Sequence, residues 1–501
     1  MKIYHLITGY LIVSLTICCS SNKNARDFET ETHSDHNIGH LIVNGHTWPT
    51  SLDTTHIKTL IVGGGIAGLS AAYNLTDSNY LVCELADNFG GTSSSLAYNG
   101  ETFCQGAHYD VGYPNHYGQE VIKMFSQLNI IGYDSTRRLW DFLDRQYFIS
   151  KDQESLSFKN GNLVSDILEP SVETDRFYDI IGDYENKMPL PTRLVGDEFR
   201  YLDTLTFEKF LLSQHPFTDN FLKCVSYQLR DDYGAGAAEI SALAGIHYYK
   251  CRPYYSVHLD YFSPPEGNAY FVDRIKNELP KNNLVSSRLI SKIKPKNGKW
   301  IIQSLDIKNE QQVIISADNI IYTGKKHAIK YVCPEVVSAK LKTHYAPWVV
   351  INFIIDGAVP GEGYWQNEFP LETNFLGFVD SRSQYGSHDR TILTAYFCYP
   401  ENARKSLISF KENQSDYIDT ALTHINNYFG KDMSPQVEKA FVKVMGHAMP
   451  IAKPGYLFND LNEHRPFDNF VYAGVDNGRL PVLFEAVDSG IQAAELINVL
   501  D

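Results

Sequence analysis

The stretch Leu60-Ile61-Val62-Gly63-Gly64-Gly65-Ile66-Ala67-Gly68 decides the fold. Its apolar beginning predicts a buried strand, and the small and apolar residues after the glycines continue at helical spacing. Gly63 permits a tight turn, Gly65 lets the backbone approach a phosphate, and Gly68 lets the helix pack closely on the strand. The start of the helix, around Ala67, offers unpaired N–H groups to an anion. The sequence therefore predicts a dinucleotide site on a βαβ unit.

An acidic residue follows this turn at the expected distance. Glu84 ends the next apolar run, Tyr80-Leu-Val-Cys-Glu84, where an acidic side chain binds a pair of ribose hydroxyls in dinucleotide-binding folds. A glycine turn without a ligand is the alternative interpretation. The complete order of strand, turn, helix, strand and acid disfavours that alternative.

A second glycine motif distinguishes between dinucleotides. Glu84-Leu-Ala-Asp-Asn-Phe-Gly90-Gly91-Thr92 resembles the corresponding motif of the flavin amine oxidase and protoporphyrinogen oxidase superfamily. The resemblance implies FAD, because in that superfamily the glycine pair lies against the phosphates and the ribityl chain. The superfamily usually has Arg or Lys where this chain has Thr92. Hydroxyl and backbone N–H groups would then replace a charged contact, at lower strength.

Three further segments resemble FAD-contacting segments of the superfamily. Gly106-Ala107 matches the segment beneath the flavin ring, and Ile290 matches the residue whose backbone recognises adenine. Tyr472-Ala-Gly474-Val-Asp476 and the helix from Phe484 match the closing motif, in which the helix dipole stabilises charge on reduced flavin. Val475 separates a Gly and an Asp that are usually adjacent. The cofactor-binding residues implied are Gly63, Gly65, Ala67, Gly68, Glu84, Gly90, Gly91, Thr92, Gly106, Ala107, Ile290, Gly474, Asp476, Phe484, Glu485 and Ala486.

Composition narrows the class of partner. The formal net charge is −15, so there is no basic surplus to neutralise nucleic-acid phosphates, and a nucleic-acid partner is not expected. Outside Cys18 and Cys19, the six cysteines form no CxxC pair and no Cys/His cluster, so no metal site is predicted. Buried free thiols are the expectation for them, with disulfides left open.

The first residues predict export. Lys2 and the apolar run from Leu6 to Ile17 have the proportions of a signal peptide and are too short to span a bilayer comfortably. Leu15-Thr-Ile-Cys18 resembles the lipobox of bacterial lipoproteins, which implies a lipid anchor to a membrane. A plain secretory signal and cleavage before Cys19 stay open. The expected location is the bacterial cell envelope.

The fold class expected is α/β, with a Rossmann-like FAD-binding lobe, βαβ with a β-meander, and an inserted mixed α/β substrate lobe. Residues 1–19 are expected to form the signal peptide, and residues 20–55 a tether with a short strand near His40–Val43. The FAD lobe is discontinuous, over 56–118, 264–340 and 440–501. The substrate lobe comes from 119–263 and 341–439, both of which look irregular. Strands are expected at 284–293, 299–304, 313–316 and 319–322.

The catalytic group is predicted less sharply than the cofactor site. His108, His447 and Lys453 are the candidates, with Lys326 as a second lysine that could face the flavin. A backbone-bonded histidine and a solvated lysine are the plain alternatives. Trp348, Tyr364 and Trp365 line a pocket or fill the core. Arg230-Asp231-Asp232 is expected to be an ordinary surface charge cluster.

The resemblance implies an FAD-dependent oxidoreductase that removes hydride from an amine-type small molecule and passes electrons to oxygen or an electron carrier. Two alternatives stay open. One is a desaturase or isomerase of a lipid-like or terpenoid-like substrate, which would show an apolar channel. The other is a non-catalytic FAD-binding protein. An amine oxidase would show aromatic side chains around the substrate pocket.

Overall fold

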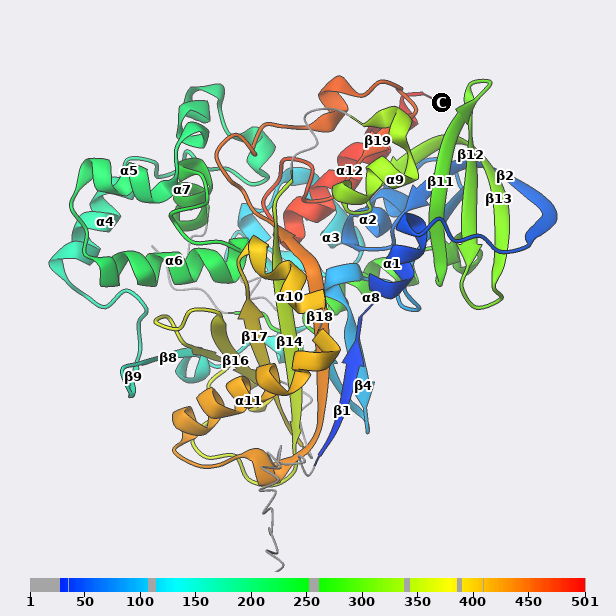
Figure 1. Cartoon of the computed structure of the whole chain (residues 1–501). Helices are drawn as coiled ribbons and strands as arrows, with labels where there is room; N and C mark the ends of the chain where they lie inside the picture. The colour runs from blue at the N-terminus through cyan, green and yellow to red at the C-terminus, as the bar shows by residue number, and fades with distance from the viewer. Residues whose placement is uncertain are drawn as a thin grey trace, which may run out of the picture.

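The computed structural model describes residues 28–34, 36–106, 114–251, 261–337, 343–384, 390–408 and 410–500. This part of the chain contains two large sheets and a separate group of helices (Figure 1). The expected signal peptide, which includes Cys18 and Cys19, lies outside the described residues. Within those residues, no helix has the length and apolar character needed to cross a membrane.

The first sheet combines a parallel half with an antiparallel meander. Its order is β10-β3-β2-β13-β12-β11, and β19 lies beside β13. The pairs β2–β3, β2–β13 and β13–β19 are parallel, whereas β11, β12 and β13 are antiparallel. The strands are β2 (Thr50–Val62), β3 (Tyr80–Cys83), β10 (Leu284–Val285), β11 (Arg288–Lys296), β12 (Lys299–Asp306), β13 (Gln311–Tyr322) and β19 (Phe470–Tyr472). The predicted Rossmann-like unit and its meander are confirmed.

Both faces of the parallel half of this sheet are buried. On one face, Ile61 and Val82 pack among α2 (Ile66–Asn74), α3 (Gln119–Gln127), α8 (Ala269–Asn277) and α12 (Leu483–Asn498). On the other face, Leu60 packs with the meander and with α9 (Ile329–Val332). A strand that is covered on both sides reads as a continuous apolar run, as the last three residues of β2, Leu60-Ile61-Val62, do.

The second sheet is larger and mixed. Its order is β1-β18-β14-β17-β16-β15-β8-β9. The helices α10 (Arg404–Ile408) and α11 (Phe410–Phe429) lie in front of it in Figure 1, and Ile418 and Leu422 pack on Val349, Ile351 and Phe353. The strands are β1 (Glu29–His33), β8 (Ser155–Lys159), β9 (Asn162–Val164), β14 (Tyr345–Ile355), β15 (Gln366–Glu368), β16 (Phe375–Asp380), β17 (Thr391–Cys398) and β18 (Val437–Pro450).

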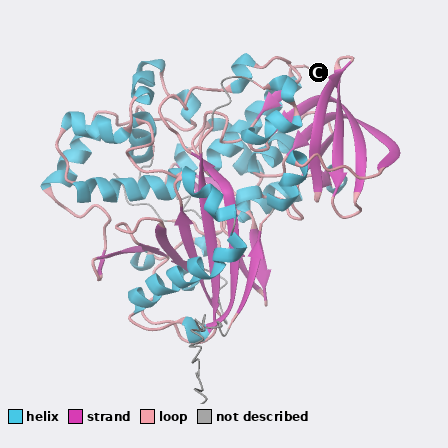
Figure 2. Ribbon diagram, in the orientation of Figure 1, coloured by secondary structure: helices cyan, strands magenta, loops and turns pink. Residues whose placement is uncertain are grey.

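Four helices form a group beside this sheet (Figure 2). They are α4 (Val172–Gly182), α5 (Phe207–Gln214), α6 (Asp219–Tyr233) and α7 (Ala242–Lys250). A Ser or Thr side chain accepts a backbone N–H at each N-terminus, and Gly234, with φ 77°, ends α6. Two hairpins complete the described strands: β4 (Ser95–Tyr98) with β5 (Glu101–Cys104), and β6 (Ile131–Asp134) with β7 (Leu139–Phe142).

Three details differ from the sequence-based expectations. The strand expected near His40–Val43 is wrong, because α1 (His36–Val43) is helical and Ile42 packs on the meander. The two short strands expected at 313–316 and 319–322 are one strand, β13. The boundary expected between 439 and 440 falls inside β18, and β1, from the expected tether, pairs with that strand. The six described cysteines are buried and are not joined in disulfides, as expected.

Candidate functional site

The three-glycine turn forms a cradle open on one side. Gly63 has φ +107°, and a methyl group on Gly68 would lie 2.0 Å from the Gly63 carbonyl oxygen, so helix and strand touch there. By contrast, a methyl group on Gly65 would meet only the Gly90 carbonyl oxygen at 3.8 Å. One on Gly91 would meet only the Gly65 Cα at 3.7 Å. The start of α2, near Ala67, therefore adjoins space that backbone atoms leave open.

Glu84 organises this cradle. Its carboxylate accepts the Gly64 N–H at 2.7 Å and the Ala86 N–H at 2.9 Å, and only 8% of the residue is exposed. Gly90 also donates its N–H to the Gly64 carbonyl oxygen at 2.9 Å. The two glycine motifs and the acidic residue, predicted from separate stretches, therefore meet at one place.

Gly106 continues this surface from the cradle into the interior. A methyl group on it would lie 1.9 Å from the Thr92 carbonyl oxygen, so only glycine fits. The Cys104 thiol accepts the Gly106 N–H at 3.2 Å. Ala107 and the candidate His108 lie outside the described residues.

The C-terminal motif approaches the cradle from the other side. Gly474 has φ +109° and donates its N–H to Ser489 Oγ at 3.0 Å. A methyl group on Gly490 of α12 would lie 2.3 Å from the Ala67 carbonyl oxygen, so α12 crosses α2 at its first turn. Asp476 instead accepts from the Lys326 N–H at 2.9 Å and from the Tyr345 hydroxyl at 2.7 Å. Its carboxylate is therefore engaged within the protein.

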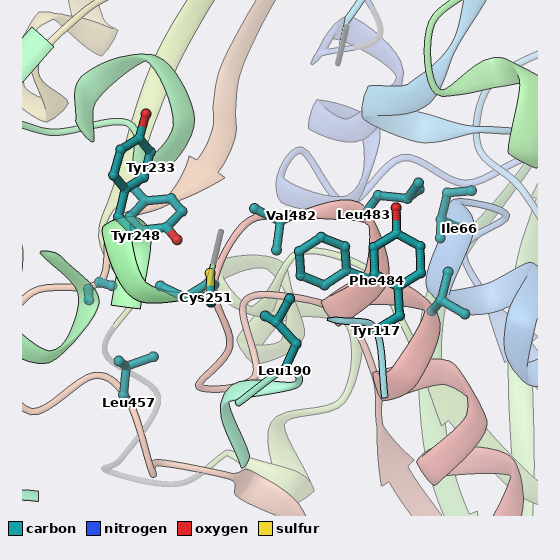
Figure 3. Close-up of a cluster of buried hydrophobic side chains, with 14 of the residues drawn as sticks. Ile66, Tyr117, Leu190, Tyr233, Tyr248, Cys251, Leu457, Val482, Leu483 and Phe484 are labelled. Carbon is teal, nitrogen blue, oxygen red and sulfur yellow. The ribbon is translucent and has the colours of Figure 1, made fainter. Parts of the chain in front are cut away.

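The first turn of α12 is packed into the core. Phe484 stacks on Tyr117 with ring centroids 5.1 Å apart, near Ile66 (Figure 3). Glu485 is fully buried, and its carboxylate accepts from Thr192 and Arg479. These predicted cofactor residues therefore have other partners, while half-buried Ala486 follows them in the same turn. Ile290 lies in β11 at a bulge opposite Ser304, and Arg288, two residues before it, donates its N–H to the Glu84 carbonyl oxygen at 2.7 Å.

A cavity of about 440 Å³ adjoins this glycine surface. Thr92, Gly106, Lys325 and Val475 line the end that belongs to the nucleotide-binding part. The second sheet and the helical group provide the remaining walls. The aromatic lining residues are Tyr178, Tyr227, Tyr248, Tyr261, Trp348, Trp365, Phe378 and Tyr396.

The alternation of β14 and β17 explains these aromatic walls. Odd-numbered residues of β14 pack under α11, so Trp348 points to the opposite face. Tyr396 of β17 lies beside it, with ring centroids 6.1 Å apart in an edge-to-face arrangement. Burial raises the pKa of the Tyr396 hydroxyl well above its usual value, so this side chain is neutral.

Four carboxylates and one ammonium group line the cavity. The carboxylates are Asp166, Asp231, Asp232 and Glu368, and the ammonium group is Lys325. Asp231 accepts from Gln366 Nε2 at 3.2 Å, and Glu368 accepts from Ser157 Oγ at 2.8 Å. The expectation of an ordinary surface charge cluster at 230–232 is wrong, because Asp232 is only 4% exposed and both aspartates line the cavity.

The candidate catalytic residues lie elsewhere. Among the described residues that line the cavity, neither His447 nor Lys453 is present. His447 Nε2 contacts Arg404 Nη1 at 2.6 Å, and its ring stacks on His327 at 3.7 Å. Burial, His327 and Arg404 lower the pKa of His447 to about 3, so this ring is neutral and accepts from Arg404. Lys453 forms ion pairs with Glu239 at 3.3 Å and with Glu401 at 3.5 Å.

The lysine that lines the cavity is Lys325, whereas the sequence predicted Lys326. The Lys325 ammonium group donates to the Ala448 carbonyl oxygen at 3.1 Å, and burial lowers its pKa. Lys326 points into the protein instead, where burial lowers its pKa to about 8. Lys325 and Lys326 are adjacent in the turn that follows β13, and the sequence alone does not show which of the two lines the cavity.

One sequence signal could have found the acidic wall. Tyr227, Gln228, Asp231 and Asp232 are spaced i, i+1, i+4 and i+5, so they share one face of α6. Leu229 and Tyr233 beside them are buried, which is unusual for a solvated charge cluster. Within the described ranges, no group of three or more His, Cys, Asp or Glu side chains is placed to hold a metal ion.

Comparison with known proteins identifies structures with the same architecture. A family model described as an NAD(P)-binding Rossmann-like domain matches residues 61–128. No curated protein matches the sequence. Putrescine oxidase, in a structure described as wild type bound to putrescine, is 14% identical, with a TM-score of 0.64 over 89% of this chain and 100% of the other.

Two further solved structures agree with this assignment. Cyclohexylamine oxidase from Brevibacterium oxydans IH-35A is 13% identical, with a TM-score of 0.62 over 89% of this chain and 99% of the other. A putative protoporphyrinogen oxidase from Exiguobacterium sp. 255-15 is also 13% identical, with a TM-score of 0.61 over 90% of this chain and 100% of the other. The chain therefore has the mixed α/β fold of the amine oxidases and protoporphyrinogen oxidases, including its Rossmann-like nucleotide-binding domain.

Proposed function

We propose that this protein binds FAD and oxidises an amine whose cationic form enters the acidic, aromatic cavity. The observation that carries the proposal is the position of that cavity. One end of it is lined by Thr92, which follows Gly91 of the cradle, and by Gly106 and Val475, which belong to the two segments that lie beside the cradle. A molecule held in the cradle would therefore meet a molecule held in the cavity.

The cradle fits the pyrophosphate and ribose of FAD. Gly65 and Gly91 leave room where backbone atoms must approach a phosphate, and the N-terminus of α2 supplies unpaired N–H groups. Glu84 faces this turn, and a carboxylate accepts up to about four hydrogen bonds, so ribose hydroxyls can share it. Thr92 supplies neutral contacts in place of a cationic side chain. When bound, FAD would supply the two-electron acceptor.

The cavity walls favour a cation. Four carboxylates against one ammonium group give the lining an acidic balance, which raises the local concentration of cationic molecules. Aromatic rings such as Trp348 and Tyr396 add cation–π attraction and exclude water. A carboxylate-bearing substrate such as an amino acid would meet like charges. An amine oxidase of the same fold, putrescine oxidase, has been described with putrescine bound, which agrees with this choice.

The reaction follows from this arrangement. The amine loses its ammonium proton, and the C–H bond next to nitrogen breaks while a C=N bond forms. The hydrogen and its two electrons would leave as hydride to FAD, and oxygen or an electron carrier would finally accept the electrons. Water then converts the resulting iminium ion to an aldehyde and ammonia when the amine is primary, or to an aldehyde and a smaller amine when it is secondary. Lys325, at the cofactor end with a lowered pKa, is placed to orient water or the amine.

The acidic wall does not favour the lipid alternative. An unsaturated lipid would require an apolar channel, whereas Glu368 and Asp232 are buried in this wall. The test is to load purified protein with FAD and add butylamine, 1,4-diaminobutane, glutamate or an unsaturated fatty acid without oxygen. Bleaching of the flavin by the amines supports the proposal. Bleaching by the fatty acid, or by none of the four, overturns it.

A further inference from the structure

The cavity has a rim at its solvent side, formed by residues 165–168, between β9 and α4. All four residues line the cavity, and Ser165 and Asp166 are exposed while Ile167 and Leu168 are half-buried. Tyr178 of α4 lines the cavity behind this rim loop. The loop therefore separates the cavity from water and determines the shape of its mouth.

The ammonium group of half-buried Lys159 holds the rim loop. Lys159 Nζ donates to the Asp166 carbonyl oxygen at 3.0 Å, to the Ile167 carbonyl oxygen at 2.7 Å and to Glu169 Oε1 at 2.8 Å. The Lys159 side chain is only 10% exposed, whereas that of Glu169 is 58% exposed. Three acceptors match the three N–H groups of an ammonium ion, and charge-assisted bonds are stronger than neutral ones.

The loop has little other backbone support. In the described part of the chain, residues 166–168 form no backbone–backbone hydrogen bond. Ser165 Oγ contacts the adjacent Asp166 carboxylate at 2.8 Å, which is a bond within the loop. The backbone conformation of residues 166 and 167 therefore depends on the hydrogen bonds that Lys159 donates to their carbonyl oxygens.

The strand β8 connects this support to the rest of the cavity wall. Ser155, Ser157 and Lys159 alternate along β8, so their side chains lie on one face. Ser155 lines the cavity, Ser157 donates to Glu368 at 2.8 Å, and Lys159 reaches the rim loop. A single face of a paired strand therefore supports both the inner acidic wall and the rim.

From this geometry we propose that Lys159 is a positioning residue that fixes the rim loop and thereby selects which amines enter the cavity. The inference rests on the proposed function for the nature of the substrate. Lys159 does not touch the cofactor cradle, so its removal changes entry and binding rather than the oxidation step.

The main variant is Lys159→Met, which keeps the length of the stem and removes all three donors. We expect hydrogen exchange in residues 160–171 to become at least about fivefold faster, because local opening costs less. The KM of a short amine should rise about five- to twentyfold with kcat nearly unchanged, as for a loss of binding alone. The KM of bulky amines should rise less than that of short amines, because the mouth of the cavity is no longer fixed.

Three matched variants separate this effect from general damage. Lys159→Arg retains a charged donor to the carbonyl oxygens and should restore much of the wild-type behaviour. Glu169→Gln removes only the exposed partner and should change little. Lys250→Met removes a side chain of similar burial, 12% exposed, which pairs with Glu185 at 2.7 Å away from the cavity lining. It should leave exchange in the rim loop and the KM unchanged.

The outcomes distinguish this proposal from the proposed function. Faster exchange in the rim loop with an unchanged KM and unchanged size preference would overturn the entry role. Unchanged exchange in Lys159→Met would overturn the positioning itself. If no amine reduces the flavin in any variant, the proposed function fails, and the exchange comparison still decides whether Lys159 fixes the loop.

Discussion

Glu485 of α12 accepts both the backbone N–H and the side-chain hydroxyl of Thr192, 293 residues away, at 2.6 and 2.5 Å. The other carboxylate oxygen of Glu485 contacts Arg479 at 3.2 Å, and Arg479 also contacts Asp488 at 2.7 Å. Arg193, next to Thr192, pairs with the same Asp488 at 2.9 Å. A buried polar network therefore ties the start of α12, which crosses α2 beside the cradle, to the segment between α4 and α5.

Glu485→Gln should destabilise the protein without weakening FAD binding. The amide weakens a buried charged network, so the free energy of unfolding should fall by about 1–3 kcal/mol. Since the Glu485 carboxylate points at Thr192, FAD affinity should stay the same. Denaturant unfolding and FAD titration measure the two effects, with exposed Glu495→Gln on the same helix as control. Loss of FAD affinity with unchanged stability would instead show that Glu485 contacts the cofactor.

Gly65→Ala should block the cofactor while leaving the apoprotein intact. The added methyl group meets only the Gly90 carbonyl oxygen at 3.8 Å, so it fits the protein but occupies the space of an approaching phosphate. FAD affinity should fall by at least about tenfold, or ~1.4 kcal/mol. Gly182→Ala in α4 meets nothing within 4 Å and serves as control. Equal FAD affinity in wild type and Gly65→Ala would place the phosphates elsewhere.

Glu84→Ala should weaken both the cofactor site and the turn that holds it. The change removes the acceptor of the Gly64 and Ala86 N–H groups and the expected ribose contact. The loss in FAD binding free energy should be about 1.5–3 kcal/mol. Isothermal titration calorimetry with FAD measures this loss. Glu84→Gln keeps one acceptor, so its FAD affinity should lie between those of wild type and Glu84→Ala. Wild-type affinity in Glu84→Ala would remove Glu84 from the site.

His447→Gln should change the acid stability of the protein more than its activity. The pKa of His447 is lowered to about 3 in the folded protein, against about 6.5 in the unfolded chain. The unfolded chain therefore takes up a proton that the folded protein resists, and stability is lost as the pH falls from about 6.5 towards 3. The variant should remove up to ~1.4 kcal/mol per pH unit of this dependence.

Denaturant unfolding at pH 7 and pH 5 measures that effect. Flavin reduction by an amine should stay within about twofold of wild type, because His447 does not line the cavity in the described structure. A large loss of reduction rate at constant stability would instead make His447 a catalytic residue.

The cradle could be predicted from the sequence because its glycines are needed for local reasons: a positive φ or a close approach of backbone atoms. Gly68 must contact the Gly63 carbonyl oxygen, and that requirement needs no knowledge of distant residues. The cavity could not be predicted in this way, because Asp231 comes from α6 and Trp348 and Tyr396 come from two strands of the second sheet.

The second sheet itself was obscured by burial. Every residue of β14 is buried, so its sequence lacks the apolar–polar alternation that identifies a strand. The role of Glu485 was missed for a different reason. Its place at the start of a helix near the cofactor motif predicts a cofactor contact, and only the folded chain brings Thr192 to it.

The most direct test compares wild type with Asp231→Asn during anaerobic titration with 1,4-diaminobutane, both loaded with FAD. Asp416→Asn, at an exposed position of α11, removes the same charge away from the cavity and is the control. We expect wild type and the control to bleach fully, whereas Asp231→Asn should need about 10- to 100-fold more amine, as for a lost charge-assisted contact. Identical titrations of wild type and Asp231→Asn, or no bleaching in wild type, would contradict this expectation.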